Sequence, residues 1–157
     1  MNAEKNMIIR LYEPSDCREI TELFYGTVHK VNAKDYTEAQ LNAWAPENPD
    51  IEEWNKTLSG HYSIVAVLDG VIVGFGDTDG AGYLDRLFVH KDYQHKGIGS
   101  ALCDKLEKSA HGKIITHASI TARTFFEKRG YKVKNVNRIV RRGTELINFT
   151  MEKVLRS

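Results

Sequence analysis

The sequence predicts a mixed α+β fold, in which one mostly antiparallel sheet of about seven strands carries helices on both faces. Three observations favour this fold class. Apolar residues recur at helical spacing in the first third of the chain, and the middle of the chain changes to short segments rich in β-branched and aromatic residues. A helix that begins with glycines then separates two strands, and such a unit makes the two strands parallel neighbours.

Size and composition exclude several classes of protein. With 157 residues the chain has the length of one domain, and we expect residues 1–157 to share one core. Lys and Arg (22) nearly balance Asp and Glu (21), which predicts no general attraction for nucleic acid. Neither a membrane-spanning run nor a signal peptide is evident, so we expect no membrane association. Cys17 and Cys103 lack metal-type spacing, which indicates reduced thiols, no metal site and a cytoplasmic location.

The first third of the chain is expected to form one strand and three helical segments. The predicted elements are a strand over Met7–Tyr12, a helix capped by Ser15 or Asp16, and helical segments over Thr37–Trp44 and Ile51–Leu58. The first helix carries apolar residues at helical spacing, namely Ile20, Leu23, Phe24, Val28 and Val31.

The middle of the chain has the period of strands. The predicted strands are Tyr62–Leu68, Val71–Asp77 and Ala81–Val89. Asp69-Gly70 joins the first two, and a two-residue Asp-Gly link is typical of a tight hairpin. We therefore expect these strands to form an antiparallel meander.

The last third alternates helices and strands. The predicted elements are a helix over Gly97–Ser109, a strand over Lys113–His117, a helix over Thr121–Arg129 and strands over Tyr131–Ile139 and Glu145–Lys153. Ile98, Leu102 and Leu106 mark the buried face of the first of these helices.

The segment from Gln94 to Ser100 (QHKGIGS) is a candidate anion site. The first turn of a helix has unpaired N–H groups and partial positive charge, and glycines let a ligand approach the backbone. Alternatively, Gly97 and Gly99 only form a tight turn between strand and helix. The segment does not fit a P-loop, which needs Gly-Lys-Ser/Thr, or a dinucleotide fingerprint, which needs a third glycine where Leu102 stands.

Two stretches resemble the signatures of the GNAT acetyltransferases. LDRLFVHKDYQHKGIGSALCDKLEK is similar to the acetyl-CoA motif Gln/Arg-x-x-Gly-x-Gly/Ala, with Gln94, Gly97 and Gly99 at the matching positions. ASITARTFFEKRGYKV is similar to the second signature, Ala-x-x-Phe-Tyr-Glu-Lys-x-Gly-Phe. The resemblance implies a GNAT-like sheet whose one parallel pair of strands splays apart. Members of the family are often homodimers.

The resemblance also implies an N-acetyltransferase that uses acetyl-CoA as co-substrate. The acceptor would be a primary amine of a small molecule or peptide, and the alternative is a non-catalytic acyl-CoA-binding module. The implied contacts with coenzyme A are pyrophosphate on the loop, pantetheine on the open strand edge and the thioester in the splay. The residues concerned are Leu87, Phe88, Val89, Gln94, His95, Lys96, Gly97, Ile98, Gly99, Ser100 and Phe126.

Acetyl transfer needs a neutral amine, so a base has to accept a proton. Asp85 is the candidate base, and its alternative role is a structural ion pair with Arg86. His117 is a second candidate, and its alternative role is an ordinary hydrogen bond. Strand alternation predicts one face with Tyr83, Asp85, Leu87 and Val89, and the other with Leu84, Arg86 and Phe88.

Phe126 departs from the family pattern. It stands where many members carry a tyrosine that protonates the departing thiolate, and phenylalanine has no proton to donate. Three alternatives follow: Tyr83 serves instead, the thiolate leaves without a dedicated acid, or catalysis has been lost.

Two further segments bear on the substrate. Aromatic residues on the first two helices and their loop are expected to select it: Phe24, Tyr25, His29, Tyr36 and Trp44. The basic run KNVNRIVRRG is interpreted as a solvated strand and turn, and the alternative is a surface for an acidic protein or RNA.

Overall fold

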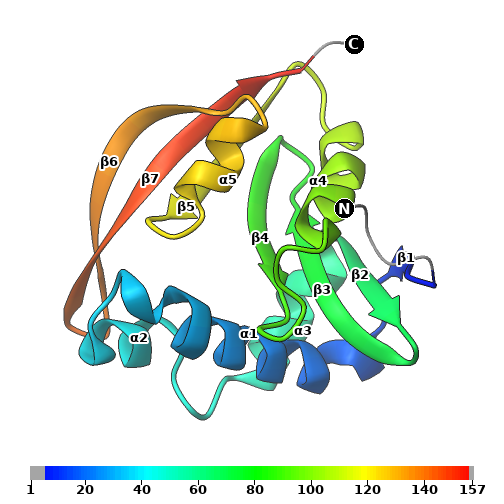
Figure 1. The fold of residues 1–157 in the computed structure, drawn as a ribbon, viewed down its shortest axis with the longest axis horizontal. Helices are drawn as coiled ribbons and strands as arrows, with labels where there is room; N and C mark the ends of the chain where they lie inside the picture. Colours follow the sequence, from blue (N-terminus) through cyan, green and yellow to red (C-terminus); the bar gives the residue numbers. More distant parts are fainter. Residues whose placement is uncertain (1–5, 156–157) are drawn as a thin grey trace.

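The sheet has seven strands in the order β1-β2-β3-β4-β5-β7-β6 (Figure 1). This computed structural model describes residues 6–155, so the first residues of the segment tested for a signal peptide lie outside it. Every neighbouring pair of strands is antiparallel except β4 and β5. The mixed, mostly antiparallel sheet predicted from the sequence is confirmed.

The observed elements match the predicted order throughout the described residues. The strands are β1 (Ile8–Leu11), β2 (Tyr62–Leu68), β3 (Val71–Thr78), β4 (Tyr83–Val89), β5 (Lys113–Ser119), β6 (Lys132–Arg141) and β7 (Thr144–Val154). The helices are α1 (Cys17–Val31), α2 (Glu38–Trp44), α3 (Ile51–Gly60), α4 (Ile98–Lys108) and α5 (Arg123–Lys128), with short 3-10 turns η1 (Pro14–Asp16) and η2 (Asn32–Lys34).

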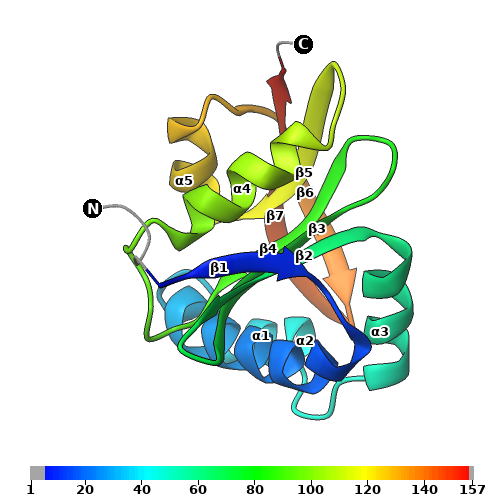
Figure 2. The ribbon, with the colours of Figure 1, turned by 90° about the vertical axis from the view of Figure 1, so that its right-hand side faces the viewer.

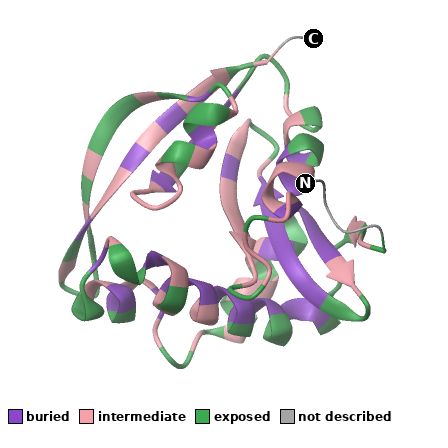
Figure 3. Ribbon diagram, viewed as in Figure 1, coloured by how far each residue is buried: buried purple, intermediate pink, exposed green. Residues whose placement is uncertain are grey.

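The helices form two layers, one on each face of the sheet. Figure 2 shows α1, α2 and α3 together on one face and α4 and α5 on the other. Each layer has its own apolar cluster, built around Phe75 and Leu58 on the first face and around Leu102 and Leu106 on the second. Figure 3 shows that burial is greatest along β3, which lies between the layers. The central strands, because they are buried between the two layers, thus support a site formed on either face.

Helix α4 packs very closely on β3, and Gly76 makes this approach feasible. A Cβ at this position would lie 2.7 Å from a methyl carbon of Leu106 and 2.9 Å from the carbonyl oxygen of Arg86. Ile98, Leu102 and Leu106 of α4 are at most 1% exposed, as the helical spacing predicts. Helix α4 is therefore held firmly against the central strands of the sheet.

Strands β4 and β5 pair only at their beginnings. Tyr83 lies opposite Ile115 and Leu84 opposite Thr116, after which the strands diverge (Figure 1). Within the described residues, no strand pairs with this edge of β4 from Asp85 to Val89. The splayed parallel pair implied by the family resemblance is present.

A bulge in β4 overturns the simple alternation expected for this strand. Asp77 pairs with Arg86 and Thr78 with Leu84, so Asp85 has no partner on β3. Because the extra residue shifts the faces, Leu84 joins Leu87 and Val89 in the core beneath α4. Tyr83 and Asp85 instead line the opposite face together with Arg86 and Phe88. The prediction that Asp85 shares a face with Leu87 was wrong for this reason.

Thr37 caps α2 through its side chain, which accepts a hydrogen bond from the N–H of Gln40. Asp16, one of the two residues expected to cap the first helix, makes no side-chain cap for α1. Its carboxylate accepts hydrogen bonds from the N–H of Glu13 and from Arg10. Cys17 and Cys103 are both buried, free thiols. None of the described helices is long and apolar enough to span a membrane.

Candidate active site

A cleft of about 840 Å³ opens on the face covered by α1, α2 and α3. One wall comes from β4 and β5 and another from β6 and β7. Its aromatic lining consists of Phe24, Tyr25, Tyr36, Trp44, Trp54, Tyr83 and Phe88. Phe24 lies at the centre of this group, with ring centroids 4.9 Å from both Phe88 and Trp54. The cleft can enclose a small molecule with apolar parts.

The cleft contains most of the aromatic residues expected to select a substrate. Phe24, Tyr25, Tyr36 and Trp44 line it. His29 does not, because its Nε2 lies 2.8 Å from the carbonyl oxygen of Ala45 and its ring stacks on Tyr25. His29 is therefore a support of the helix layer.

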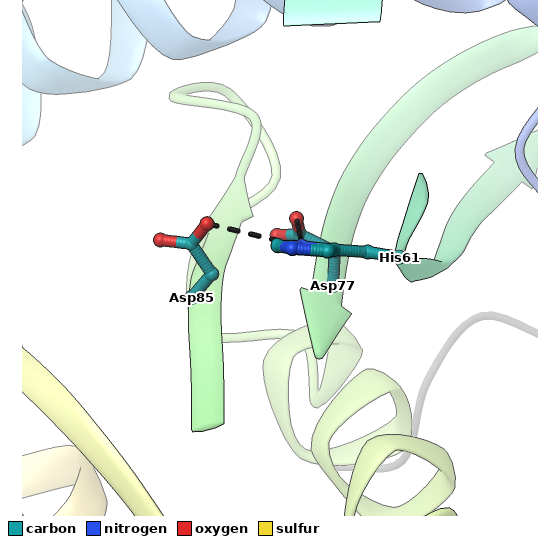
Figure 4. Close-up of side chains that lie close together, drawn as sticks. All are labelled: His61, Asp77 and Asp85. Atoms are coloured by element: carbon teal, nitrogen blue, oxygen red, sulfur yellow. Dashed lines mark hydrogen bonds and ion pairs between the residues drawn. The ribbon is translucent and has the colours of Figure 1, made fainter. Parts of the chain in front are cut away.

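Asp85 belongs to a cluster of ionisable side chains with Asp77 and His61 (Figure 4). The carboxylate of Asp77 is completely buried, and its Oδ2 lies 2.8 Å from His61 Nδ1 and 2.9 Å from Arg86 Nη2. Asp85 lies farther from the same two side chains, with its Oδ2 3.9 Å from His61 Nδ1 and 3.7 Å from Arg86 Nη2. The ion pair expected between Asp85 and Arg86 is therefore secondary, because Arg86 is engaged mainly by Asp77.

This environment prepares Asp85 to accept a proton. Burial raises the pKa of Asp85, and the charge of Asp77 raises it further, while Arg86 and His61 act in the opposite direction. The side chain is still 29% exposed, so a substrate can reach it from the cleft. A carboxylate with a raised pKa in a cleft is a candidate general base.

Tyr83 and His117 form a second polar pair where β4 and β5 separate. Tyr83 Oη lies 3.1 Å from His117 Nδ1, and both residues line the cleft. Burial and the charge of Asp85 raise the pKa of Tyr83 to about 12. Tyr83 therefore keeps its proton at neutral pH and can donate it. The structure brings together all three residues predicted for catalysis: Asp85, Tyr83 and His117.

The loop before α4 has the geometry of an anion site. His95 and Gly97 both adopt positive φ, at 61° and 81°, and no side chain caps the first turn of α4. Residues with positive φ within such a loop turn successive N–H groups toward one side. The side chain of Gln94 donates hydrogen bonds to the carbonyl oxygens of Val89 and His90, so it fixes the loop.

The two glycines of the loop have different roles. Gly97 needs its left-handed backbone, whereas Gly99 lies within α4 and has no positive φ. A Cβ at Gly99 would make only ordinary contacts, 3.5 Å from the ring of Phe125 and 3.6 Å from Val89. The protein itself does not require glycine there, and the missing side chain leaves the backbone of α4 open to close approach by a ligand.

Phe125, rather than Phe126, lies beside Gly99. Phe126 is 4% exposed and packs in the core, with its ring centroid 4.9 Å from that of Tyr131. Its assignment to cofactor binding therefore does not fit its position, and Phe125 takes its place as the candidate. The second signature places two adjacent phenylalanines in this helix, and sequence alone does not show which one is turned inward.

The open edge of β4 is partly occupied. The carbonyl oxygen of Val89 accepts hydrogen bonds from Thr27 Oγ1 at 2.9 Å and from Gln94 Nε2 at 2.8 Å. This carbonyl is therefore engaged by the protein, and Leu87 and Phe88 remain as the backbone candidates for an extended ligand. Ile98 turns its side chain into the core at 1% exposure, so it can contribute only its backbone.

His61 and Asp77 were not predicted from the sequence as residues of the site. Asp77 was expected only as the end of a strand and His61 as part of a loop, and the two lie on different segments. The β2–β3 pairing, in which Ser63 lies opposite Asp77, brings His61 beside Asp77. Pairing across a sheet depends on register, so no local pattern could have shown this cluster.

The comparisons with known proteins agree on one family. Residues 32–153 match the model described as "Acetyltransferase (GNAT) domain". The chain is 34% identical to the uncharacterized N-acetyltransferase YafP of Escherichia coli, over 93% of this chain and 95% of that protein. A GCN5-related N-acetyltransferase structure from Rhodopseudomonas palustris has 36% identity and a TM-score of 0.94, covering 99% of each chain. A PaiA N-acetyltransferase from Thermoplasma acidophilum, solved with coenzyme A, shares the fold at 21% identity and a TM-score of 0.77, over 95% of this chain and 99% of that one.

Proposed function

Because the chain belongs to the GNAT acetyltransferase family, we propose that it transfers the acetyl group of acetyl-CoA to a primary amine of a small molecule or peptide. One observation carries this proposal. The separation of β4 from β5 after Leu84 leaves an open strand edge between the loop before α4 and the cleft that contains Asp85. An anion site and a candidate base are thus joined by the same strand.

The described residues fit coenzyme A at three positions. The backbone N–H groups of His95 to Ser100 would bind its pyrophosphate, supported by the uncapped start of α4. The missing side chain of Gly99, beside Phe125, would let the ligand approach the helix backbone closely. The backbone of Leu87 and Phe88 would bind the pantetheine arm. Acetyl-CoA supplies an activated acetyl group.

Asp85 and Tyr83 would move the protons of the reaction. Asp85 accepts the proton that the amine loses as its nitrogen bonds to the acetyl carbon, directly or through water. Tyr83 donates a proton to the sulfur as the carbon–sulfur bond breaks, and His117 at 3.1 Å orients the tyrosine hydroxyl. Much of the rate would come from holding amine and thioester together at the splay.

The test is release of free thiol from acetyl-CoA in the presence of a panel of primary amines. We expect turnover with at least one amine, and we expect Asp85→Asn to lower kcat by about 100-fold or more without a large change in the KM for acetyl-CoA. Glu52→Gln on the exposed face of α3 is the matched control and is expected to behave like the wild type. Tight binding of coenzyme A without turnover on any amine would contradict the proposal, and full activity of Asp85→Asn would remove this residue from the mechanism.

A further inference from the structure

The wall of the cleft formed by β6 and β7 is polar and basic, unlike the aromatic wall across from it. Asn137 donates hydrogen bonds to Asn148 Oδ1 at 2.9 Å and to Thr150 Oγ1 at 2.8 Å, which fixes a row of polar groups across the two strands. Asn137, Ile139 and Arg141 occupy every second position of β6 and so share one face of the strand. Ile139 packs against the apolar cluster on the cleft side of the sheet. Arg141 accordingly lies on the cleft side of β6 and lines the cleft.

Arg141 differs from the other arginines of the cleft because it has no partner. Arg86 is bound by Asp77, Arg138 by Glu145 at 3.1 Å, and Arg142 donates to the carbonyl oxygen of Ala43 at 2.8 Å. Among the described residues, the side chain of Arg141 makes no hydrogen bond or ion pair. The bond from Arg142 holds the β6–β7 hairpin against the end of α2, which keeps Arg141 at the cleft.

The charge of Arg141 acts on Tyr83. Burial and Asp85 raise the pKa of Tyr83, and Arg141 opposes this rise, which shows that the guanidinium lies within electrostatic reach of the tyrosine hydroxyl. The acidic residues at the cleft are Asp85, which is assigned to proton transfer, and Asp50 and Glu53 on α3. Asp50 is occupied as the cap of α3, where it accepts a hydrogen bond from the N–H of Glu53.

From this arrangement we propose that the acetyl acceptor carries a carboxylate in addition to its amine, and that Arg141 binds the carboxylate while the amine faces Asp85. An arginine binds a carboxylate through two parallel hydrogen bonds, which fixes orientation as well as position. The proposal rests on the proposed acetyltransferase function and narrows its substrate class. A cleft of about 840 Å³ with an aromatic wall suits a small amino acid or short peptide with a free carboxyl end.

The experiment compares acceptors that differ only in the carboxylate. Thiol release from acetyl-CoA is measured with phenylalanine against phenethylamine, and with 4-aminobutyrate against propylamine. In at least one pair we expect the wild type to prefer the carboxylate by about 10-fold or more in kcat/KM. Arg141→Gln is expected to lower kcat/KM for that substrate about 10-fold more than for its partner, mainly through KM. The ratio between wild type and variant within one pair cancels differences in amine basicity.

Arg138→Gln is the control, because it also removes one positive charge from β6 but from an arginine already paired with Glu145. We expect it to keep the wild-type discrimination. Equal loss of discrimination in both variants would show a general field instead of a specific contact, and would overturn the proposal. So would a wild type that treats the members of every pair alike, or an Arg141→Gln variant that still discriminates.

A binding measurement separates this proposal from the proposed function. The same amines are titrated calorimetrically into protein saturated with coenzyme A. If no amine is acetylated, the proposed function fails. Binding of a carboxylate-bearing amine that is lost in Arg141→Gln would then still support the carboxylate site, and absence of such binding in the wild type would overturn it.

Discussion

Arg86 binds Asp77 with two hydrogen bonds, from Nε to Oδ1 at 3.2 Å and from Nη2 to Oδ2 at 2.9 Å. Asp77 is fully buried, and the guanidinium also lies 4.6 Å from the ring centroid of Trp54. Because Arg86 is hydrogen-bonded to Asp77, its Nη2 makes only a longer contact with Asp85 Oδ2, at 3.7 Å. Burial is the main cause of the raised pKa of Asp85, and the negative charge of Asp77 raises this pKa by more than Arg86 lowers it.

Asp77→Asn is expected to move the acidic limb of the pH profile of kcat/KM to lower pH. Asp85 has to be ionised to act as a base, so activity falls as the pH drops through its pKa. Removing the charge of Asp77 lowers that pKa, and the released Arg86 would turn toward Asp85 and lower it further. The profile is measured with one amine throughout, so that the titration of the substrate cancels between variants.

His61→Gln is the matched partner of this variant and shifts the profile the other way. His61 lowers the pKa of Asp85, so its removal is expected to move the acidic limb to higher pH. Asp77→Asn also breaks a buried ion pair and is expected to cost about 3–5 kcal/mol of stability, so each profile is recorded below the melting temperature of the variant. Shifts in the same direction, or none, would show that Asp85 is not the titrating base.

Gly99→Ala is expected to weaken coenzyme A binding without weakening the fold. The added methyl group makes only ordinary contacts within the protein, and alanine favours a helix over glycine by about 0.5–1 kcal/mol. We expect an unchanged or higher melting temperature of the free protein and a KM for acetyl-CoA raised about 10-fold.

Gly97→Ala serves as the contrast to Gly99→Ala. Gly97 has a φ of 81°, so alanine there is strained and is expected to lower the melting temperature as well as the affinity. If Gly99→Ala bound coenzyme A as tightly as the wild type, Gly99 would not be part of the cofactor site.

Strand β4 shows which features of the fold were predictable from the sequence and which were not. Periodicity and the Asp-Gly hairpin predicted the strands correctly, since apolar spacing and turn chemistry are local properties of the chain. The faces of β4 were predicted wrongly because the bulge at Asp85 depends on pairing with β3. The same limit applies to Asp77 and His61, whose partnership arises from register, and to Arg141, which strand β6 brings to the cleft from far along the chain.

Tyr83→Phe is expected to lower kcat by about 10- to 100-fold with little change in the KM for acetyl-CoA. The hydroxyl of Tyr83 is the candidate acid, and its pKa of about 12 predicts that it does not produce a basic limb below pH 10. Full activity of Tyr83→Phe would contradict the assignment of Tyr83 as the acid, and a basic limb below pH 10 that is lost only in this variant would contradict its raised pKa.

Phe126→Tyr tests whether the usual family tyrosine could take over in the Tyr83→Phe background. Phe126 is 4% exposed in the core, so the added hydroxyl would be buried at a cost of about 1–3 kcal/mol and would not reach the cleft. We expect the double variant to be less stable and no more active than Tyr83→Phe. Recovery of activity would show that position 126 does face the thioester.

Glu107→Gln is expected to destabilise the protein where α4 meets α5, β6 and β7. Burial alone would raise the pKa of Glu107, but hydrogen bonds from Lys153, Arg129 and Tyr131 lower it below its ordinary value. The carboxylate accepts from Lys153 Nζ at 3.0 Å, Arg129 Nη2 at 3.1 Å and Tyr131 Oη at 2.8 Å. Losing the charge should remove about 2–3 kcal/mol at pH 7, which lowers the melting temperature by about 4–12 °C.

The destabilisation caused by Glu107→Gln is expected to decrease as the pH falls. The pKa of Glu107 is lower in the folded than in the unfolded protein. The stabilisation that the ionised carboxylate provides is therefore complete above the ordinary pKa of 4.5, and it is lost as the pH falls through the pKa of the folded protein. The difference in melting temperature between wild type and variant is therefore expected to shrink on acidification. Glu127→Gln, which removes an exposed carboxylate paired only with Arg123, is expected to change stability by less than about 0.5 kcal/mol at any pH. A constant difference for Glu107→Gln across the acidic range would show that packing, and not the charge of Glu107, stabilises this junction.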